Sequence, residues 1–307
     1  MARCFVTRDL PGKALERLGA EHDVEVWPES EPPPRAELLA RAPEVDALLT
    51  LLTDRVDDDL LDAAPALKAI ANYAVGTDNI DLDAATRRGI PVGNTPDVLT
   101  ETTADLAFAL MLATARRIVE ADAAVRAGDW PEWQPGAFLG HDLQGATLGI
   151  VGYGRIGRAV GRRGEGFGMT VLHGIPLPEL LERSDFVSLH APLTPDTRGM
   201  IGRDELGAMK PTAILVNTAR GPLVDTGALE SALREGQIAG AGLDVADPEP
   251  LPADHPLLRA PNLVVVPHIG SATHRTRQAM ADMAVDNLLA ALAGEGMPHC
   301  ANPQVYE

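Results

Sequence analysis

The sequence is poor in cysteine and contains no long apolar run. Its two cysteines among 307 residues, Cys4 and Cys300, stand near opposite ends, so neither a disulfide framework nor a metal signature is expected. The longest largely apolar stretch, 106–115, covers ten residues, whereas a membrane span needs roughly 20. The N-terminal residues lack the apolar segment of a signal peptide. These absences predict a cytoplasmic protein without a membrane span.

Positive charge is scarce as well. Lys and Arg number 26 against 44 Asp and Glu, which gives a formal net charge of −18. A nucleic-acid-binding protein typically carries a basic surface, so no nucleic-acid partner is expected. The composition, 45% hydrophobic and 23% charged, is that of an ordinary globular protein. At roughly 150 residues per domain, the length favours two domains.

The first hundred residues alternate short apolar runs with helical patterns. The runs predict strands, and helices fit between them, as at 11–18 and 82–88; the strands are expected at 3–7, 24–26, 47–52, 69–72 and 91–93. Continuous apolar runs are typical of parallel strands that are buried on both faces. The alternation therefore predicts an α/β domain with a parallel sheet.

A single long helix is predicted from Thr102 to about Arg126. Apolar residues cover most of its faces, which is typical of a helix buried between domains or at a subunit contact. A loop with Trp130, Pro131 and Trp133 follows it.

A second α/β series begins at Thr147 and ends with a helix over about 275–292. Its strands are predicted at 147–151, 170–172, 186–189, 213–217, 241–245 and 263–266. The two series thus predict the α/β class, with two parallel sheets that are each flanked by helices.

The sharpest motif is the glycine sequence Gly152-Tyr153-Gly154-Arg155-Ile156-Gly157. It follows an apolar strand and opens a helix, which is the context that a dinucleotide-binding fingerprint requires. Gly152 allows a tight turn, Gly154 allows close approach to a pyrophosphate, and Gly157 allows close packing of helix and strand. The helix N-terminus adds free N–H groups for the phosphates.

Polar residues follow the other strands of this series, at the edge where a parallel sheet binds ligands. They are His190, Thr218, Ala219, Arg220, Asp244, Glu249 and His268. A histidine can protonate a carbonyl oxygen while hydride arrives, and a carboxylate can orient the imidazole. An arginine can hold a substrate carboxylate in a planar fork. Position alone does not choose between His190 and His268, and each residue taken singly also fits a structural role.

Five segments together resemble the D-isomer-specific 2-hydroxyacid dehydrogenases over nearly the whole chain. They are 72–81 (NYAVGTDNID), 152–157 (GYGRIG), 217–221 (NTARG), 242–250 with its Glu249-Pro250, and 267–271 (PHIGS). The resemblance implies Arg220, Glu249 and His268 as catalytic residues, which decides for His268 over His190. It also implies NAD or NADP as cofactor and two similar, Rossmann-like domains. These would be a discontinuous, flavodoxin-like substrate domain over 1–97 plus 271–307 and a dinucleotide-binding domain over 98–270.

The resemblance further implies which residues meet the ligands. The substrate would contact Arg220, the backbone N–H groups of Val75 and Gly76, the region of Leu52, and Trp133. The cofactor-binding residues would be Thr103, Gly152, Gly154, Arg155, Ile156, Gly157, His190, Pro192, Thr197, Thr218, Ala219, Asp244 and Gly270, with no metal. A homodimer through the 102–145 region is also implied.

Within the family, the sequence is most similar to the glyoxylate/hydroxypyruvate reductases. Family phosphoglycerate dehydrogenases carry an arginine at the position of Asn72, and phosphite enzymes carry a lysine at that of Val75. We therefore expect NAD(P)H-dependent reduction of glyoxylate or hydroxypyruvate to the D-2-hydroxy acid. Two alternatives remain: another dehydrogenase of the family that acts on a larger 2-keto acid, and a non-enzymatic NAD-sensing protein.

One interval departs from the family pattern. An acidic residue is expected roughly 20 residues past the fingerprint, but Leu172 is followed by His173-Gly174-Ile175-Pro176. About fifteen residues of the family, with a loop and a short parallel strand, are absent there; two residues cannot form the crossover of a parallel strand. Either the protein has lost the loop, or the chain has an unresolved gap between His173 and Gly174. The matching flanks favour the gap, and NAD versus NADP stays unassigned.

Overall fold

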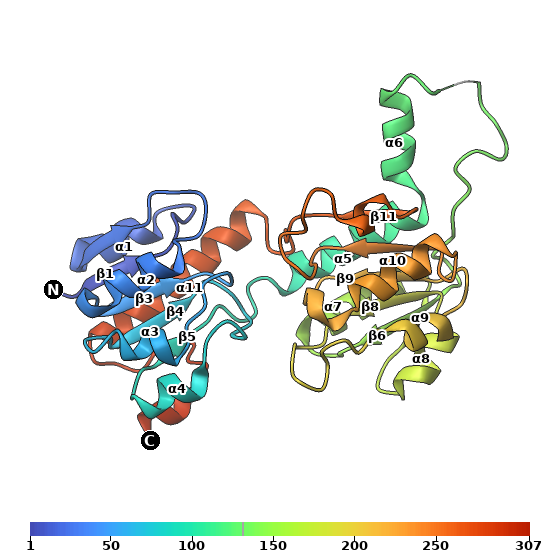
Figure 1. The fold of residues 1–307 in the computed structure, drawn as a ribbon. Helices are drawn as coiled ribbons and strands as arrows, with labels where there is room; N and C mark the ends of the chain where they lie inside the picture. Colours follow the sequence, from blue (N-terminus) through green and yellow to red (C-terminus); the bar gives the residue numbers. More distant parts are fainter. Residues whose placement is uncertain (131) are drawn as a thin grey trace. The chain divides into compact units, whose positions relative to one another are not determined.

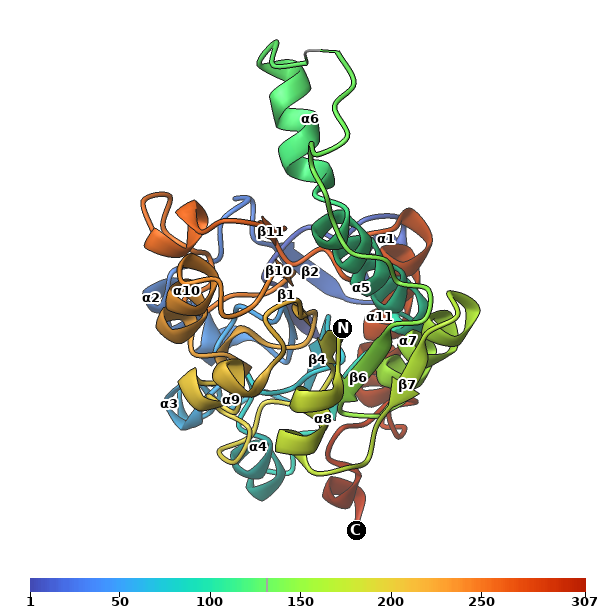
Figure 2. The same ribbon diagram turned by 90° about the vertical axis from the view of Figure 1, so that its right-hand side faces the viewer.

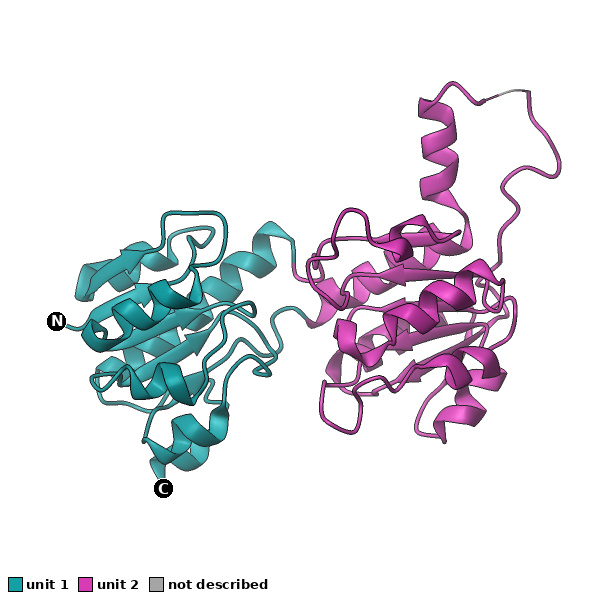
Figure 3. Cartoon of the chain, viewed as in Figure 1, with its two compact units in different colours: residues 1–99, 272–307 teal, residues 100–271 magenta. Residues whose placement is uncertain are grey.

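The computed structural model describes residues 1–130 and 132–307. The chain forms two compact units, Met1–Leu99 with Ala272–Glu307 and Thr100–Ser271 (Figure 3). The predicted boundaries at 97/98 and 270/271 fall within two residues of these divisions. In the described part of the chain, none of the helices combines the length and the apolar character needed to cross a membrane.

The first unit is built on a five-stranded parallel sheet in the order β2-β1-β3-β4-β5 (Figure 1). Its strands are β1 (Arg3–Val6), β2 (Asp23–Val26), β3 (Ala47–Thr50), β4 (Ala69–Asn72) and β5 (Val92–Gly93). Its helices are α1 (Ala14–Glu21), α2 (Arg35–Arg41), α3 (Asp58–Asp62), α4 (Leu82–Arg87) and α11 (His274–Leu292). Helix α11 returns from the end of the chain to pack on β3, β4 and α1, which makes this unit discontinuous in sequence.

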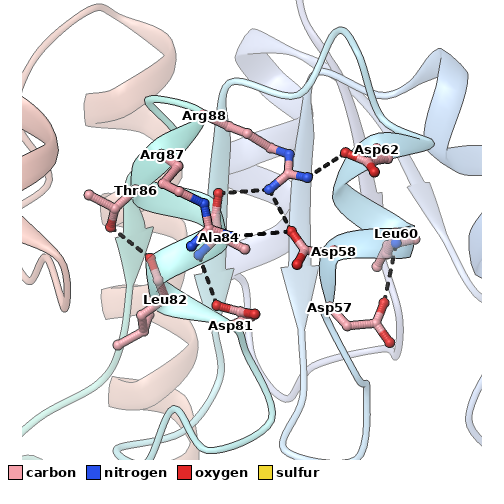
Figure 4. A network of polar contacts seen from close by, with 10 residues as sticks. All are labelled: Asp57, Asp58, Leu60, Asp62, Asp81, Leu82, Ala84, Thr86, Arg87 and Arg88. Atoms are coloured by element: carbon pink, nitrogen blue, oxygen red, sulfur yellow. Dashed lines mark hydrogen bonds and ion pairs between the residues drawn. The ribbon is translucent and has the colours of Figure 1, made fainter.

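Two short helices of the first unit each have a capping carboxylate, and ion pairs join them to each other (Figure 4). The Asp57 carboxylate accepts the N–H of Leu60 at the start of α3, and that of Asp81 accepts the N–H of Ala84 at the start of α4. Arg88 then reaches across to Asp58 and Asp62 on α3. Because helices this short have little stability of their own, the caps and the cross-links help to fix them.

The second unit contains a six-stranded parallel sheet in the order β11-β10-β9-β8-β6-β7. Its strands are β6 (Thr147–Val151), β7 (Thr170–Leu172), β8 (Phe186–Leu189), β9 (Ile214–Asn217), β10 (Gly240–Leu243) and β11 (Leu263–Val265). Its helices are α5 (Thr100–Ala115), α6 (Ile118–Arg126), α7 (Arg155–Gly166), α8 (Leu177–Arg183), α9 (Arg203–Ala208) and α10 (Thr226–Arg234). Two parallel sheets flanked by helices confirm the predicted α/β class.

The predicted single helix from Thr102 to Arg126 is wrong. The chain forms two helices, α5 and α6, because Arg117 between them adopts a left-handed conformation with φ of 50°. Its guanidinium pairs with Glu120 in the first turn of α6. The expected burial holds for α5 alone: α5 buries eight residues, whereas α6 buries none. Figure 2 shows α6 and the loop after it standing away from the sheet of their unit.

The gap expected between His173 and Gly174 is also wrong. The chain is continuous there and forms a short turn from β7 to α8, in which Gly174 has φ of +66°. A glycine takes this left-handed conformation without the steric cost of a Cβ atom. Ile175 belongs to no strand, and β7 is the last strand at its edge of the sheet. The crossover to β8 runs through α8, so the difficulty of a two-residue crossover does not arise.

Candidate active site

The second sheet brings the chemically important residues of its unit to one edge. Its register matches the last residues of five neighbouring strands: Val151, Leu189, Asn217, Leu243 and Val265. The next residues along these strands open the loops of that edge and include Gly152, His190, Thr218 and Asp244. Parallel strands thus place at one edge the groups that the sequence separates by about a hundred residues.

The glycine loop after β6 has the close approaches that its sequence predicts. A Cβ atom on Gly152, which has φ of +91°, would lie 2.5 Å from the backbone N of Ala191. A Cβ atom on Gly157 would lie 2.2 Å from the Gly152 carbonyl oxygen, whereas one on Gly154 would meet open space. Helix α7 begins at Arg155, and its N-cap residue is Gly154, which has no side chain to cap the first turn. The open space at Gly154, next to the N-terminus of α7, suits the close approach of a pyrophosphate.

Two buried polar atoms beside this loop have no hydrogen-bond partner among the described residues. They are Nδ1 of His190 and Oγ1 of Thr218, at the ends of β8 and β9. Burial lowers the pKa of His190 to about 4, so its ring is neutral at pH 7, and its Nε2 lies 2.8 Å from Ser188 Oγ. Since buried polar atoms are normally paired, these two fit a site that a polar ligand completes.

His268 and Glu249 form a close pair at the end of β11. The distance from His268 Nδ1 to Glu249 Oε1 is 2.6 Å, as expected for a histidine that a carboxylate orients, and both side chains are partly exposed. His268 has φ of 52°, a left-handed conformation that is uncommon outside glycine, and its N–H donates to the Asp244 carbonyl. The pair leaves Nε2 as the ring nitrogen that faces away from Glu249.

The charge of Glu249 is stabilised by its neighbours. Burial alone would raise the pKa of its carboxyl, but the His268 ring, the N–H of Ala246 and the Arg220 charge together hold that pKa below its ordinary value. Glu249 is thus ionised at neutral pH and can accept a hydrogen bond from the neighbouring ring. Arg220 follows β9, and one of its Nη atoms donates to the Ala219 carbonyl.

Asp244, by contrast, accepts hydrogen bonds from the backbone just beyond His268. Its carboxylate accepts the N–H groups of Ile269, at 2.6 Å, and Gly270, at 2.9 Å. Burial raises the pKa of this carboxyl, in spite of these two bonds. Thr103 on α5 donates to the Gly270 carbonyl, so two of the predicted cofactor residues hold a third in place.

The remaining predicted cofactor residues lie in loops of the same unit. Thr197 Oγ1 donates to the Pro192 carbonyl at 2.7 Å and closes the loop after β8. The N–H of Ala219 donates to Asn217 Oδ1 at 3.0 Å. Ile156 is half-buried on the first turn of α7.

Residues Leu52, Val75 and Gly76 lie in two loops of the first unit that a pair of asparagines ties together. Asn79 Nδ2 donates to the carbonyls of Leu51 and Asp54, at 3.0 and 2.9 Å, and Asn72 Nδ2 donates to the Gly76 carbonyl at 2.9 Å. The two amides also bond to each other. Leu52 and Val75 remain exposed at 38% and 36%. Sequence reasoning missed this clasp, because Asn79 lies 28 and 25 residues from Leu51 and Asp54 in the sequence.

Trp133 lies in the loop after α6 with 84% of its surface exposed. Trp130 in the same loop is 76% exposed, and Pro131 between them lies outside the described residues. This exposure leaves most of the Trp133 side chain outside the core of its own unit.

Comparisons with known proteins find related sequences and related structures. Residues 108–270 match the family model described as "D-isomer specific 2-hydroxyacid dehydrogenase, NAD binding domain". A glyoxylate reductase of Korarchaeum cryptofilum is 51% identical over 322 aligned positions, which cover 99% of this chain and 97% of the relative. That alignment exceeds the 307 residues of the chain by 15 positions, which accords with a shortened chain.

Solved structures give the same result. A crystal structure of a Thermus thermophilus protein is 53% identical, with a TM-score of 0.92, and the match covers 97% of this chain and 99% of that one. The NADPH-dependent glyoxylate/hydroxypyruvate reductase of Sinorhizobium meliloti, solved with NADP and malonate, is 35% identical, with a TM-score of 0.87 over 99% and 98% of the two chains.

Proposed function

The chain belongs to the D-isomer-specific 2-hydroxyacid dehydrogenase family and is an NAD(P)-dependent oxidoreductase, and from this premise we propose that it reduces glyoxylate or hydroxypyruvate to the D-2-hydroxy acid. The observation that carries the proposal is the His268–Glu249 pair at the edge of the sheet that bears the glycine loop. The names of its relatives support the choice of substrate. A cytoplasmic location is part of the proposal, since Cys4 and Cys300 are free thiols.

The residues around the glycine loop fit a dinucleotide. Gly152, Gly154, Arg155, Ile156 and Gly157 would hold the pyrophosphate, with the α7 N-terminus supplying N–H donors. The unpaired Nδ1 of His190 and Oγ1 of Thr218 would gain partners. Pro192, Thr197, Ala219, Thr103, Asp244 and Gly270 complete the proposed set. When bound, NADH or NADPH supplies the hydride for the reduction.

His268 supplies the proton in this proposal. Its Nδ1 faces Glu249, so its Nε2 is the atom that gives a proton to the substrate oxygen as the carbonyl is reduced. Glu249 fixes the ring orientation and stabilises the charged form of the ring before transfer. In the oxidative direction, the same nitrogen accepts the proton. His190 is unsuited to this role, because its ring is buried and its pKa is about 4.

Arg220 binds the substrate carboxylate in the proposal, through the planar geometry of its guanidinium. We assign the backbone N–H groups of Val75 and Gly76 to the same carboxylate, and Leu52 to the apolar side of the substrate. Asn72 cannot recognise a substrate phosphate as an arginine could, because it is buried and its amide bonds to Gly76 and Asn79. A small, unphosphorylated keto acid therefore suits these residues best.

We also propose that the protein is a homodimer through the 102–145 region. Several apolar side chains of α6 and the loop after it are exposed, as on an unpaired interface: Ile118, Val119, Val125, Trp130, Trp133 and Leu139. Exposed apolar surface of this kind marks protein contacts, and Trp133 would then contact the substrate site of the second copy. Light scattering on the purified protein tests the oligomeric state. A monomer at micromolar concentration would contradict the proposed dimer.

A panel of keto acids tests the proposed reaction. We expect rapid oxidation of NADH or NADPH with glyoxylate and hydroxypyruvate and slow oxidation with bulky acids. Phosphohydroxypyruvate should be a poor substrate relative to hydroxypyruvate, since no fixed cation stands at position 72 or 75. Equal kcat/KM values for hydroxypyruvate and its phosphorylated form would contradict the assignment. Tight dinucleotide binding without turnover of any acid would instead indicate a sensor.

A further inference from the structure

The turn after β7 has neither of the groups that usually select the cofactor. In dinucleotide folds, a carboxylate near the end of the second strand binds the 2′-hydroxyl of NAD, and an arginine there accepts the 2′-phosphate of NADP. Here β7 ends at Leu172 and α8 begins at Leu177, with His-Gly-Ile-Pro between them. From Gly152 to Pro178, Glu165 in the last turn of α7 is the one acidic residue. Any selection at the 2′ position must come from other groups.

An aromatic stack stands at the end of β7. The His173 and Tyr153 rings are nearly parallel, at an interplanar angle of 5°, and their centres are 3.5 Å apart. Tyr153 is the residue between the first two glycines of the fingerprint, so the stack fixes His173 against the phosphate-binding loop. His173 itself is exposed. The short turn thus places an imidazole beside the fingerprint.

Arg158 lies next to this stack on the first turns of α7. Its Nε donates to the Tyr153 carbonyl at 3.2 Å, and the side chain is exposed. Arg162 and Arg163, farther along α7, pair with Glu101, and Arg163 also pairs with Asp105. In the described part of the chain, no carboxylate pairs with Arg158. Its Nη atoms are therefore available to an anion, close to the positive N-terminal end of the helix.

We propose that Arg158 and the His173–Tyr153 stack bind the 2′-phosphate of NADP(H) and that this enzyme prefers NADPH to NADH. The proposal rests on the proposed function, because it concerns the cofactor of that reaction. The guanidinium donates hydrogen bonds to the phosphate, and the His173 ring forms the wall beside it. NADH gains no such bonds, since no carboxylate stands here to accept its 2′-hydroxyl.

Binding measurements without turnover test the preference. By calorimetry at low salt, we expect adenosine 2′,5′-bisphosphate to bind roughly 10-fold to 100-fold more tightly than 5′-AMP, as suits a charge-assisted hydrogen bond. The ratio should shrink as salt is added, because exposed charges are screened. Arg158→Ala should bring the ratio close to one and leave NADH binding unchanged.

Two further variants make the test specific. His173→Asp provides the missing carboxylate and should reverse the preference toward NADH. Arg183→Ala removes the same charge from α8, where Arg183 pairs with Glu179, and should leave the ratio unchanged. Equal affinity of the wild-type protein for the two nucleotides, or an equal loss of NADH and NADPH binding in Arg158→Ala, would overturn the inference. A protein that binds neither dinucleotide would contradict the proposed function instead.

Discussion

At the scale of single residues, the His268–Glu249 pair gives the sharpest prediction. Replacing His268 by Ala should lower turnover by roughly 10²- to 10⁴-fold, because a positioned general acid is lost. Replacing Glu249 by Gln should move the alkaline limb of the pH–rate profile for reduction to lower pH, since the ionised carboxylate no longer favours the protonated ring. Initial rates across pH check both variants. An unchanged profile in Glu249→Gln would remove Glu249 from the proposed role.

A second prediction concerns the asparagine clasp of the first unit. Asn79→Ala removes the amide that donates to the Leu51 and Asp54 carbonyls. The loop that carries Leu52 and the loop that carries Val75 then lose the hydrogen bonds that connect them. We expect KM for the keto acid to rise more than kcat falls, because the change affects positioning and leaves the proton donor intact. Steady-state kinetics measure the split. A fall in kcat alone, with KM unchanged, would argue against this positioning role.

At the scale of elements, the cap of α4 is open to a direct test (Figure 4). Asp81→Ala removes the carboxylate that accepts the Ala84 N–H and should cost about 1 kcal/mol of stability, the usual loss for an N-cap. Urea unfolding measures the change. Asp83→Ala, in the first turn of the same helix, is the matched control and should cost less, since Asp83 caps no N–H group. Equal losses in the two variants would contradict the capping role.

The break between α5 and α6 shows what local pattern cannot predict. The helix breaks at Arg116 and Arg117, where no glycine or proline stands. Arginine is a good helix former, so these residues do not predict a break. Glu120 pairs with Arg117, three residues away, and also accepts the N–H of Asn262, so the contacts at the break include a residue that is far away in sequence. By contrast, the strand before the glycine loop was predictable to the residue, because a buried parallel strand is a continuous apolar run and the turn after it needs glycine.

The site was predictable to a similar extent. Strand ends and the glycine motif located the edge, but they could not choose between His190 and His268, since both follow a strand. The resemblance implies His268, and the burial of His190 and the contact of His268 with Glu249 support that proposal. The Tyr153–His173 stack could not be foreseen, because it depends on the path of the turn after β7, where the sequence departs from the expected family pattern.

At the scale of the whole molecule, stability should decrease in acid. Asp46 and Asp57 in the first unit and Asp185 in the second have pKa values below the ordinary 3.8, in spite of some burial, because N–H groups and cationic side chains stabilise their charged forms. A carboxyl with a lowered folded-state pKa stabilises the fold above its unfolded pKa and loses that effect as the pH falls through its folded pKa. The loss should therefore begin near pH 4 and continue below it.

Asp185 offers the test of this trend. Its carboxylate accepts the Thr147 N–H and pairs with Lys210, which joins the starts of three neighbouring strands. Asp185→Asn should lower the urea midpoint at pH 7 and should reduce the difference between the midpoints at pH 7 and pH 3.5. A difference as large as that of the wild-type protein would show that other carboxylates dominate the acid response.

The short turn after β7 also affects the tendency of this protein to aggregate at high concentration. It leaves β7 as the outermost strand of its sheet, with one row of backbone groups that no neighbouring strand pairs. Such a row can recruit a strand from another molecule and seed aggregation. Here it is only three residues long, and the left-handed Gly174 soon turns the chain away. An edge this short offers a foreign strand few hydrogen bonds, so β7 is a poor template for aggregation.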